Sequence, residues 1–370
     1  MKVLCERERL LHVFQTAASV APSRSPKPTV QNVKIDAQQD RVTLVATDLE
    51  MGVRMEVQGV EVQAPGSALL PIARFGPILR ESCDERLTLE SDGSKILIHG
   101  DRSEFNLPAQ NPDEFPQVQA FEEKSYYQLP ARFFRELIRR TVFATEPESS
   151  RYALGGVLIE LSARQITAVA TDGHRLAKQD GPAQCVGECE TAENTIIPAQ
   201  AMQLIERALA DNDGDIQLAM RENDVLVKSE RTTIYSRLLE GRYPRWRDVF
   251  PRSKDAVHIE LCVGPFHAAL RQAAILTTTE RRGVDLTFGP GKVVVATHGA
   301  EMGEARVEVP LAYDGAEKAI MLNPRFMCEF LRVLDQERMF TIELRDAQTA
   351  VVCHTDDGYS YVVMPLMRER

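Results

Sequence analysis

The sequence contains no run of about 18 apolar residues, the length that a helix needs to cross a bilayer, so we expect no membrane-spanning helix. Its first residues, Met1–Glu8, reach acidic side chains before an apolar signal core could form, and we expect no export signal. The seven cysteines, an odd number, are scattered from position 5 to position 353. This distribution is typical of free thiols in a reducing cytoplasm.

Candidate metal ligands are also sparse. Cys185 and Cys189 lie four positions apart in a glycine-containing segment, without a second Cys or His pair nearby. Structural zinc sites usually need two such ligand pairs. None of the seven histidines stands at metal-ligand spacing from another. The sequence therefore gives no reason to expect a metal or another cofactor.

Positive charge is in short supply, with 44 Lys and Arg against 54 Asp and Glu and a net charge of −10. Taken alone, this balance argues against a general nucleic-acid binder. Otherwise the composition is ordinary for a globular protein, with 44% hydrophobic and 26% charged residues. A chain of 370 residues can form two or three domains, each with its own core.

The chain repeats itself at intervals of about 125 residues. Three apolar segments carry the repeat, and their Ala-Thr pairs begin at positions 46, 170 and 296. An apolar run and a short polar break precede each segment, a pattern that predicts a strand–turn–strand hairpin. The turns are expected at Ala37–Asp40, Ser162–Gln165 and Gly289–Lys292.

Helical patterns stand before and after each hairpin, some of them opened by Pro or Asn. The six helical segments are 5–20, 67–81, 131–145, 198–210, 264–280 and 322–334. Further short strands are expected, for example at Lys95–His99, Val225–Ser229 and Met339–Leu344. The fold class is therefore α+β: three tandem copies of two helices plus antiparallel sheets. The expected domains are 1–124, 125–253 and 254–370.

The helical segments are basic although the chain is acidic. They contain twelve Arg, no Lys and seven Glu, a net charge of +5, so the remainder carries −15. A shared basic surface on an acidic body suits loose contact with phosphates rather than base-specific binding. Similar modules joined head to tail also tend to close into rings, which removes exposed sheet edges. Two chains of three modules would form a ring of six.

With these features the chain resembles a known family, the bacterial β sliding clamps, processivity subunits of DNA polymerase III. The resemblance covers essentially all 370 residues. Its markers are Thr47–Met51, Arg151-Tyr152 with Leu154, Ala170–Ala177, Glu240–Pro244, Arg281–Val284 and Tyr361–Pro365. The resemblance implies a non-catalytic homodimeric ring around duplex DNA, three domains per chain, without cofactor. It also implies a cytoplasmic, nucleoid-associated location.

The resemblance further implies partners and sites. The partners would be duplex DNA without sequence preference, the polymerase III catalytic subunit, the clamp loader, and repair polymerases and mismatch-repair proteins that carry short peptide motifs. The positions that match the family's peptide pocket are Leu154, Thr171, Gly173, His174, Arg175, Leu176, Pro244, Val249, Val362, Val363, Met364, Pro365 and Leu366. The matching DNA contacts are Arg24, Arg80, Arg151 and Tyr152. The matching dimer-interface positions are Arg74, Ile78, Phe105, Leu107, Ile275 and Leu276.

The chain departs from the family pattern in a few places. Asp248 precedes Val249, where the family often has a second Arg, and the tail Leu366–Arg370 is longer and more charged. Both differences bear on which peptides bind. Ala199-Gln200 stands where the family usually has basic residues, and Glu148 lies in a loop that contacts DNA in the family. We therefore expect fewer direct DNA contacts than is usual in the family.

Three alternatives compete with the clamp. An enzyme built on Asp172 and His174 is disfavoured, because two such residues on one strand cannot pair with a nucleophile and no Ser or Cys motif accompanies them. Gly289–Lys292 lacks the glycine spacing and the Ser or Thr of a phosphate-binding loop. A three-repeat peptide-binding scaffold that never encircles DNA shares the pocket and remains open.

Overall fold

The structure is a computed structural model that describes residues 1–146, 148, 153–189, 191–251, 255–278, 283–299 and 303–367. The chain divides into two compact units. The first unit comprises Met1–Arg135, Ala183–Glu190 and Gln200–Leu238, and the second comprises Glu136–Pro182, Thr191–Ala199 and Leu239–Arg370. The middle repeat contributes strands to both units. No helix in the described part of the chain is long and apolar enough to cross a membrane.

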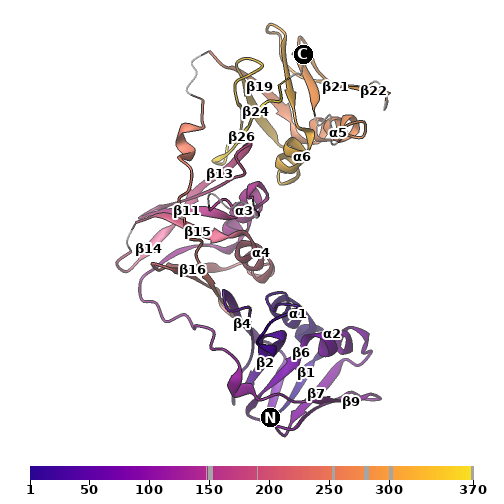
Figure 1. The fold of residues 1–370 in the computed structure, drawn as a ribbon, viewed down its shortest axis with the longest axis vertical. Coiled ribbons are helices and arrows are strands. Elements are labelled where there is room, and N and C mark those ends of the chain that lie inside the picture. Colours follow the sequence, from indigo (N-terminus) through magenta and orange to yellow (C-terminus); the bar gives the residue numbers. More distant parts are fainter. Residues whose placement is uncertain are drawn as a thin grey trace. The chain divides into compact units, whose positions relative to one another are not determined.

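The first unit contains two antiparallel sheets (Figure 1). The five-stranded sheet has the order β5 (Val60–Ala64), β1 (Lys2–Glu6), β7 (Arg86–Ser91), β8 (Lys95–His99), β9 (Glu104–Pro108). The nine-stranded sheet has the order β14 (Gln184–Val186), β10 (Tyr126–Pro130), β16 (Asp215–Met220), β17 (Asp224–Lys228), β18 (Thr232–Arg237), β4 (Met51–Val57), β3 (Val42–Thr47), β2 (Asn32–Ala37), β6 (Gly66–Pro71). Pairing of β18 with β4 joins strands of the first and second repeats, with Ile234 opposite Val53.

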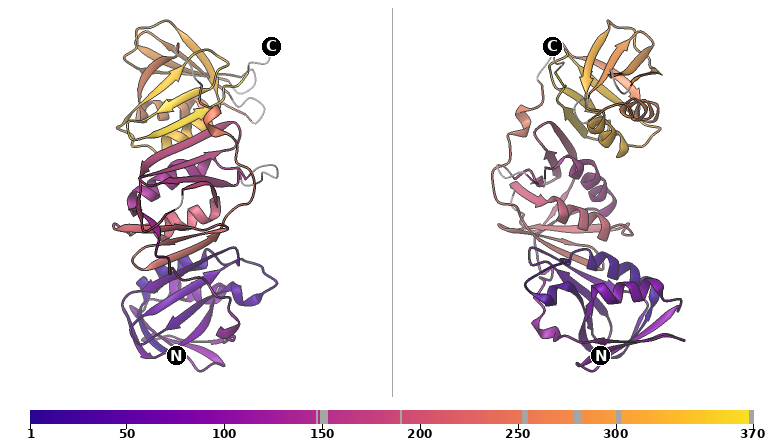
Figure 2. Two further views of the ribbon diagram at one scale, coloured as in Figure 1. Left: turned by 90° about the vertical axis from the view of Figure 1, so that its left-hand side faces the viewer. Right: turned by 45° about the vertical axis from the view of Figure 1, so that its right-hand side comes forward.

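Helices α1 (Arg7–Ala18) and α2 (Ile72–Glu81) lie side by side in this unit (Figure 2). Their contact includes Phe14 and Phe75, which are 1% and 0% exposed and meet edge to face with ring centroids 5.0 Å apart. Aromatic pairs in this geometry add to the stabilisation from apolar burial. Helix α1 contacts β3 and β4, so the helix pair is anchored on the sheet of the first hairpin.

The second unit also contains two antiparallel sheets. The eight-stranded sheet has the order β15 (Ala192–Pro198), β11 (Gly156–Ser162), β12 (Gln165–Thr171), β13 (Arg175–Pro182), β26 (Tyr359–Val363), β25 (Val351–His354), β24 (Met339–Leu344), β19 (Val257–Cys262). The four-stranded sheet has the order β22 (Gly303–Pro310), β21 (Lys292–Gly299), β20 (Val284–Gly289), β23 (Lys318–Leu322). Helices α5 (Val263–Ala274) and α6 (Pro324–Arg332) contact each other in this unit. The division between the units falls within α3 (Ala131–Thr141), after Arg135, and after the first residue of α4 (Ala199–Ala208).

All three predicted hairpins are confirmed. β2 pairs with β3, β11 with β12, and β20 with β21, each antiparallel. In the third hairpin Gly289 pairs with Lys292, and Gly291 has a φ of +77° between them. Glycine adopts this left-handed conformation without steric cost, as a tight turn requires. The Gly289–Lys292 segment is therefore a hairpin turn and not a phosphate-binding loop.

The six α-helices of the described chain are shorter than the six predicted segments, and five of them lie within those segments; α5 begins at Val263, one residue before its segment. Residues 5 and 6 belong to β1, which pairs with two neighbouring strands, so α1 starts at Arg7. Asn323 caps α6, because its side chain accepts a hydrogen bond from the Arg325 backbone N–H at 3.0 Å. That cap agrees with the predicted Asn start.

The expectation of seven free thiols is wrong for one pair. Cys185 and Cys189 form a disulfide, with their Cα atoms 6.0 Å apart. Gly187 lies between them with a φ of +80°, and this turn brings the two side chains together. The other five cysteines are free. Among the described residues, no group of three or more His, Cys, Asp or Glu side chains could hold a metal ion.

Candidate functional site

A tight turn between β12 and β13 forms one wall of the candidate site. The Thr171 hydroxyl donates to the Arg175 carbonyl at 2.6 Å and accepts from the Gly173 N–H at 3.1 Å. The Asp172 carboxylate accepts from the N–H groups of His174 and Arg175 at 2.9 and 3.0 Å. Gly173 has a φ of +88°, where an L side chain is strained. The turn presents Gly173 and His174 to solvent.

The last strand of the chain forms the adjoining wall. β26 pairs with β13, with Val362 opposite Leu176 and Val363 opposite Arg175. The Met364 N–H then donates to the His174 carbonyl at 2.9 Å. Strands from the second and third repeats thus meet in one sheet, and Met364 lies beside the turn.

The interior beneath these walls is apolar. One buried cluster consists of Ala153, Leu154, Leu158, Val169, Leu176, Ile196, Tyr243, Trp246, Val352 and Val362. Leu239, Phe250 and Ala350 pack against it and are partly buried. The buried Tyr243 hydroxyl donates to the Val169 carbonyl at 3.0 Å, so its polar tip is satisfied.

Exposed apolar side chains extend from the same segments. Val249, Met364 and Met367 are 41%, 44% and 72% exposed, and they are three of the six large apolar side chains exposed in the described chain. Exposed apolar side chains that gather in one patch mark interaction sites, whereas single ones are ordinary. We refer to Val249, Met364, Met367, His174 and Gly173 with the half-buried Pro244 as the cleft.

The structure divides the predicted pocket residues into two groups. The buried ones are Leu154, Thr171, Arg175, Leu176, Val362 and Val363. The exposed or half-buried ones are Gly173, His174, Pro244, Val249, Met364, Pro365 and Leu366. All of them fall in the second unit. Sequence reasoning missed Trp246 and Phe250, although aromatic residues in a polar linker were an available signal.

Arg175 acts inside the protein rather than in the cleft. Its side chain is 6% exposed, and it donates to Asp172 Oδ2 at 2.9 Å, to the Phe143 carbonyl at 2.8 Å, and to Glu329. Burial alone would lower the pKa of Arg175, but Tyr361, Glu329 and Asp172 together raise it above the ordinary value. Arg175 is therefore a charged anchor that fixes the turn bearing His174.

A second buried arginine, Arg140, holds the segment just before the start of β26. Arg140 is 3% exposed and donates to Gln179 Oε1 at 2.8 Å and to Asp357 Oδ2 at 2.9 Å. Burial would raise the pKa of the Asp357 carboxyl, but hydrogen bonds from Arg140, Thr355 and Arg338 outweigh it and leave the pKa well below its usual range. This network fixes the turn that leads into the last strand.

The predicted DNA contacts lie partly outside the described residues, as Arg151 and Tyr152 do. Arg24 is exposed in the loop before the short helix Pro28–Gln31, and Arg80 is exposed on α2. Nine of the twelve helical arginines are exposed. The other three have internal roles: Arg7 donates to the Leu79 and Asp84 carbonyls, Arg135 donates to the Ala210 carbonyl, and Arg140 is buried.

The predicted dimer-interface residues lie at accessible places. Arg74 and Ile78 are on α2, and Phe105 and Leu107 are half-buried on β9, an outer strand of the five-stranded sheet. Ile275 directly follows α5 and is 74% exposed, the most exposed large apolar side chain in the described residues. The half-buried Leu276 follows it.

Comparison with known proteins finds relatives that match almost the whole chain. Three family models match: the DNA polymerase III beta subunit N-terminal domain over residues 1–119, the central domain over 128–245 and the C-terminal domain over 247–367. The Beta sliding clamp of Pseudomonas putida is 30% identical over 373 residues, covering 99% of this chain and 100% of that protein. The Beta sliding clamp of Escherichia coli K12 is 27% identical, with the same coverage.

Solved structures of sliding clamps match this chain along its full length. The DNA polymerase sliding clamp from Bacillus subtilis superposes with a TM-score of 0.90 at 25% identity, and both chains are covered completely. The DNA polymerase III subunit beta from Pseudomonas aeruginosa superposes with a TM-score of 0.88 at 27% identity, again over 100% of both chains.

Proposed function

Because this chain belongs to the DNA polymerase III beta subunit family, the sliding clamps, we propose that two copies close into a ring around duplex DNA and hold partner proteins through the cleft. The family is non-catalytic, and the chain has its three-domain fold. Its role is to keep the replicative polymerase on DNA, and the relatives favour this function over the scaffold that never encircles DNA.

The cleft is the observation that carries the proposed partner binding. Exposed Val249 precedes Phe250, which packs against the buried apolar cluster, and exposed Met364 follows β26, which contributes Val362 to that cluster. The turn at His174 and the last strand are fixed by hydrogen bonds. A short extended peptide with Leu or Phe anchors would cover these side chains, and the fixed walls would set its direction. The occupants we propose are segments of the polymerase III catalytic subunit, the clamp loader, and repair polymerases and mismatch-repair proteins.

DNA would be held by topology and loose charge contacts. Exposed arginines on the helices, together with Arg24, Arg80, Arg151 and Tyr152, would meet phosphates without reading bases. A net charge of −10 limits tight direct binding, which suits a ring that must slide. This role would be carried out in the cytoplasm, at the nucleoid.

Two outer strands support the proposed ring closure. β9 and β22 are edges of their sheets, and an unpaired edge is a ready site for another strand. Exposed Ile275, with Leu276, Ile78, Phe105 and Leu107, would supply the apolar part of the junction. We assign the modules to 1–124, 125–253 and 254–370, so that two chains supply six.

Primer extension on singly primed circular DNA tests the proposal, with the polymerase and clamp loader of the same organism. The Met364→Asp variant should lose long products, because a charge in the cleft opposes burial of the apolar anchors of the clamp loader and of the polymerase alike. Met339→Asp is a matched control, since Met339 is 51% exposed on β24 of the same unit. Wild-type protein that dissociates equally fast from circular and linear DNA would contradict the ring. Equal product lengths for both variants would contradict the cleft.

A further inference from the structure

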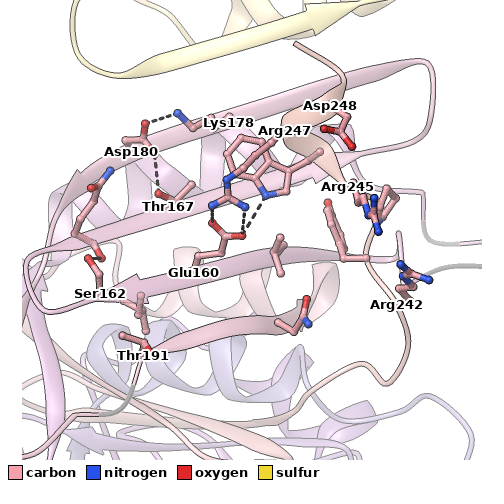
Figure 3. A pocket seen from close by; sticks show the side chains of 17 residues that line it. Glu160, Ser162, Thr167, Lys178, Asp180, Thr191, Arg242, Arg245, Arg247 and Asp248 are labelled. Carbon is pink, nitrogen blue, oxygen red and sulfur yellow. Dashed lines mark hydrogen bonds and ion pairs between the residues drawn. The ribbon is translucent and has the colours of Figure 1, made fainter.

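A polar cavity lies on the eight-stranded sheet, next to the cleft (Figure 3). Its volume is about 890 Å³, and its walls come from β11, β12, β13, β15 and the linker 242–248. Figure 3 shows its side chains in three groups: Lys178, Asp180 and Thr167 at one end, Glu160 and Arg247 in the middle, and Arg242 and Arg245 at the other end.

The two carboxylates on the sheet are already satisfied by neighbours. Glu160 accepts hydrogen bonds from Arg247 at 3.0 and 2.6 Å and from Trp246 Nε1 at 3.2 Å. Asp180 accepts from the Thr167 hydroxyl at 2.7 Å and pairs with Lys178. The Arg247 guanidinium also lies 4.3 Å from the centre of the Trp246 ring. These contacts fix the middle of the cavity and leave no carboxylate there for Arg242 or Arg245.

Arg242 and Arg245 are exposed, and among the residues that the structure describes neither guanidinium has an ion pair or side-chain hydrogen bond. In Figure 3 both side chains extend away from the Glu160–Arg247 pair. The cavity wall contains one further carboxylate, Asp248, whose backbone N–H donates to the Arg245 carbonyl at 3.0 Å. Arg242, Arg245 and Asp248 together give this part of the wall two positive charges and one negative charge.

The cavity and the cleft share the linker 242–249. Pro244 lines the cavity and lies between Arg242 and Arg245 in sequence, and Val249 of the cleft follows Asp248 directly. Leu158, Tyr243 and Trp246 line the cavity and also belong to the buried cluster beneath the cleft. A peptide seated in the cleft thus has its flanking residues within reach of the two arginines.

We propose that Arg242 and Arg245 form a second contact for bound partners and select those with acidic residues flanking the anchor peptide. This inference rests on the proposed use of the cleft. Guanidinium groups bind carboxylates in a bidentate manner, and two of them on one short linker suit two or more Asp or Glu side chains. The occupant is an acidic segment of the partner protein itself, because anchoring in the cleft raises its effective concentration at the arginines.

The test uses labelled peptides derived from the clamp-binding segment of the organism's polymerase III catalytic subunit. Versions carry four Glu, four Gln or four Lys at either end, and one version has no extension. For wild-type protein, Glu extension at one end should tighten binding about fivefold over Gln extension, since two partly exposed ion pairs give a modest gain. The gain should shrink as salt rises.

Substitution then locates the effect. R242Q with R245Q should remove the preference for Glu and leave the affinity of the unextended peptide unchanged. R242E with R245E should favour the Lys extension. The matched control is R271Q with R332Q, which removes two exposed arginines on α5 and α6 of the same unit. The control variant should keep the full preference for Glu.

Three results would overturn the proposed role of Arg242 and Arg245 or of the cleft. No preference for Glu, or an equal loss in the control, overturns the selection of acidic partners. If R242Q with R245Q weakens binding of a short DNA duplex and not of the Glu peptide, the arginines serve phosphates and the proposal fails. If the unextended peptide does not bind wild-type protein at all, the cleft is not the peptide site, and this outcome is distinct from loss of the preference for Glu.

Discussion

Leu49 and Gly173 occupy the same position of the same turn in two repeats. Their φ values are +85° and +88°, and in each turn a Thr hydroxyl and an Asp carboxylate bond the following backbone N–H groups. The turns follow β3 and β12, the second strands of their hairpins. The repeat therefore extends to single hydrogen bonds in these two copies, and of the two only the second places a glycine at the left-handed position.

That difference predicts opposite effects of substitution. Leu49→Gly should stabilise the protein by about 1 kcal/mol, because glycine removes the left-handed strain and Leu49 is 49% exposed. Gly173→Ala should destabilise it by about 1 kcal/mol, since a Cβ there meets nothing within 4 Å and only backbone strain changes. Urea unfolding measures both. Leu49→Ala is the control, and a gain equal to that of Leu49→Gly would mean that side-chain removal, not strain, is responsible.

Arg175 and Arg325 both pair with Glu329 but differ in burial. The Arg175 side chain is 6% exposed, whereas that of Arg325 is 77% exposed. Arg175→Met should cost about 3 kcal/mol, because it leaves the carboxylates of Asp172 and Glu329 without their buried partner. Arg325→Met should cost about 0.5 kcal/mol or less, as exposed pairs do. Equal changes in the unfolding midpoint would contradict the assignment of Arg175 as an internal anchor.

The Asp357 network predicts a pH dependence. In the folded protein, burial raises the pKa of the Asp357 carboxyl, but hydrogen bonds from Arg140, Thr355 and Arg338 outweigh burial and lower it. In the unfolded chain an Asp carboxyl has a pKa of about 4. Below that pH the unfolded state binds the extra proton, so stability from this group is present at neutral pH and is lost as pH falls.

Asp357→Asn should therefore lower stability by about 2 kcal/mol at pH 7, and the difference from wild type should narrow below about pH 4. Urea unfolding at a series of pH values measures this difference. Asp356→Asn is the control, because Asp356 is 82% exposed and, within the described residues, pairs with Arg338 alone. A difference that stays constant down to about pH 3 would exclude ionisation of Asp357 as its cause.

Truncation tests the cleft, but the cut must fall after Val363. A deletion of residues 362–370 would remove Val362 and Val363, which are 1% and 0% exposed in a strand between β13 and β25. Deleting residues 364–370 leaves β26 whole and removes Met364 and Met367 from the surface. This shorter deletion should abolish polymerase binding and leave the dimer intact. Undiminished polymerase affinity, measured by surface plasmon resonance, would place the peptide site elsewhere.

The dimer junction is tested at the end of α5. Ile275→Ala with Leu276→Ala should raise the dimer dissociation constant at least tenfold, because apolar area buried at the junction is lost. Sedimentation measures the shift from twice 41.4 kDa toward 41.4 kDa on dilution. Met339→Ala, which removes an exposed apolar side chain elsewhere in the second unit, should leave the constant unchanged. An unaltered constant for the double variant would remove these residues from the junction.

The sequence alone determined the repeat, the hairpins and the helices. These features rest on local periodicity: the alternation in 42–47 and 165–171 and the helical spacing in 131–141 depend on residues a few positions apart. Turn chemistry is local too, so the glycines of Gly289–Lys292 and their place in the repeat suffice to predict a hairpin turn.

Only the tertiary structure decided how distant segments combine. Val363 pairs with Arg175, and Asp357 with Arg140, across some two hundred residues of chain. Alternation shows which face of a strand is buried but not which strand lies beside it. The sequence therefore could not show that Arg175 points into the protein while Arg242 and Arg245 have no ion-pair partner among the described residues. Burial and charge pairing depend on neighbours that folding alone brings together.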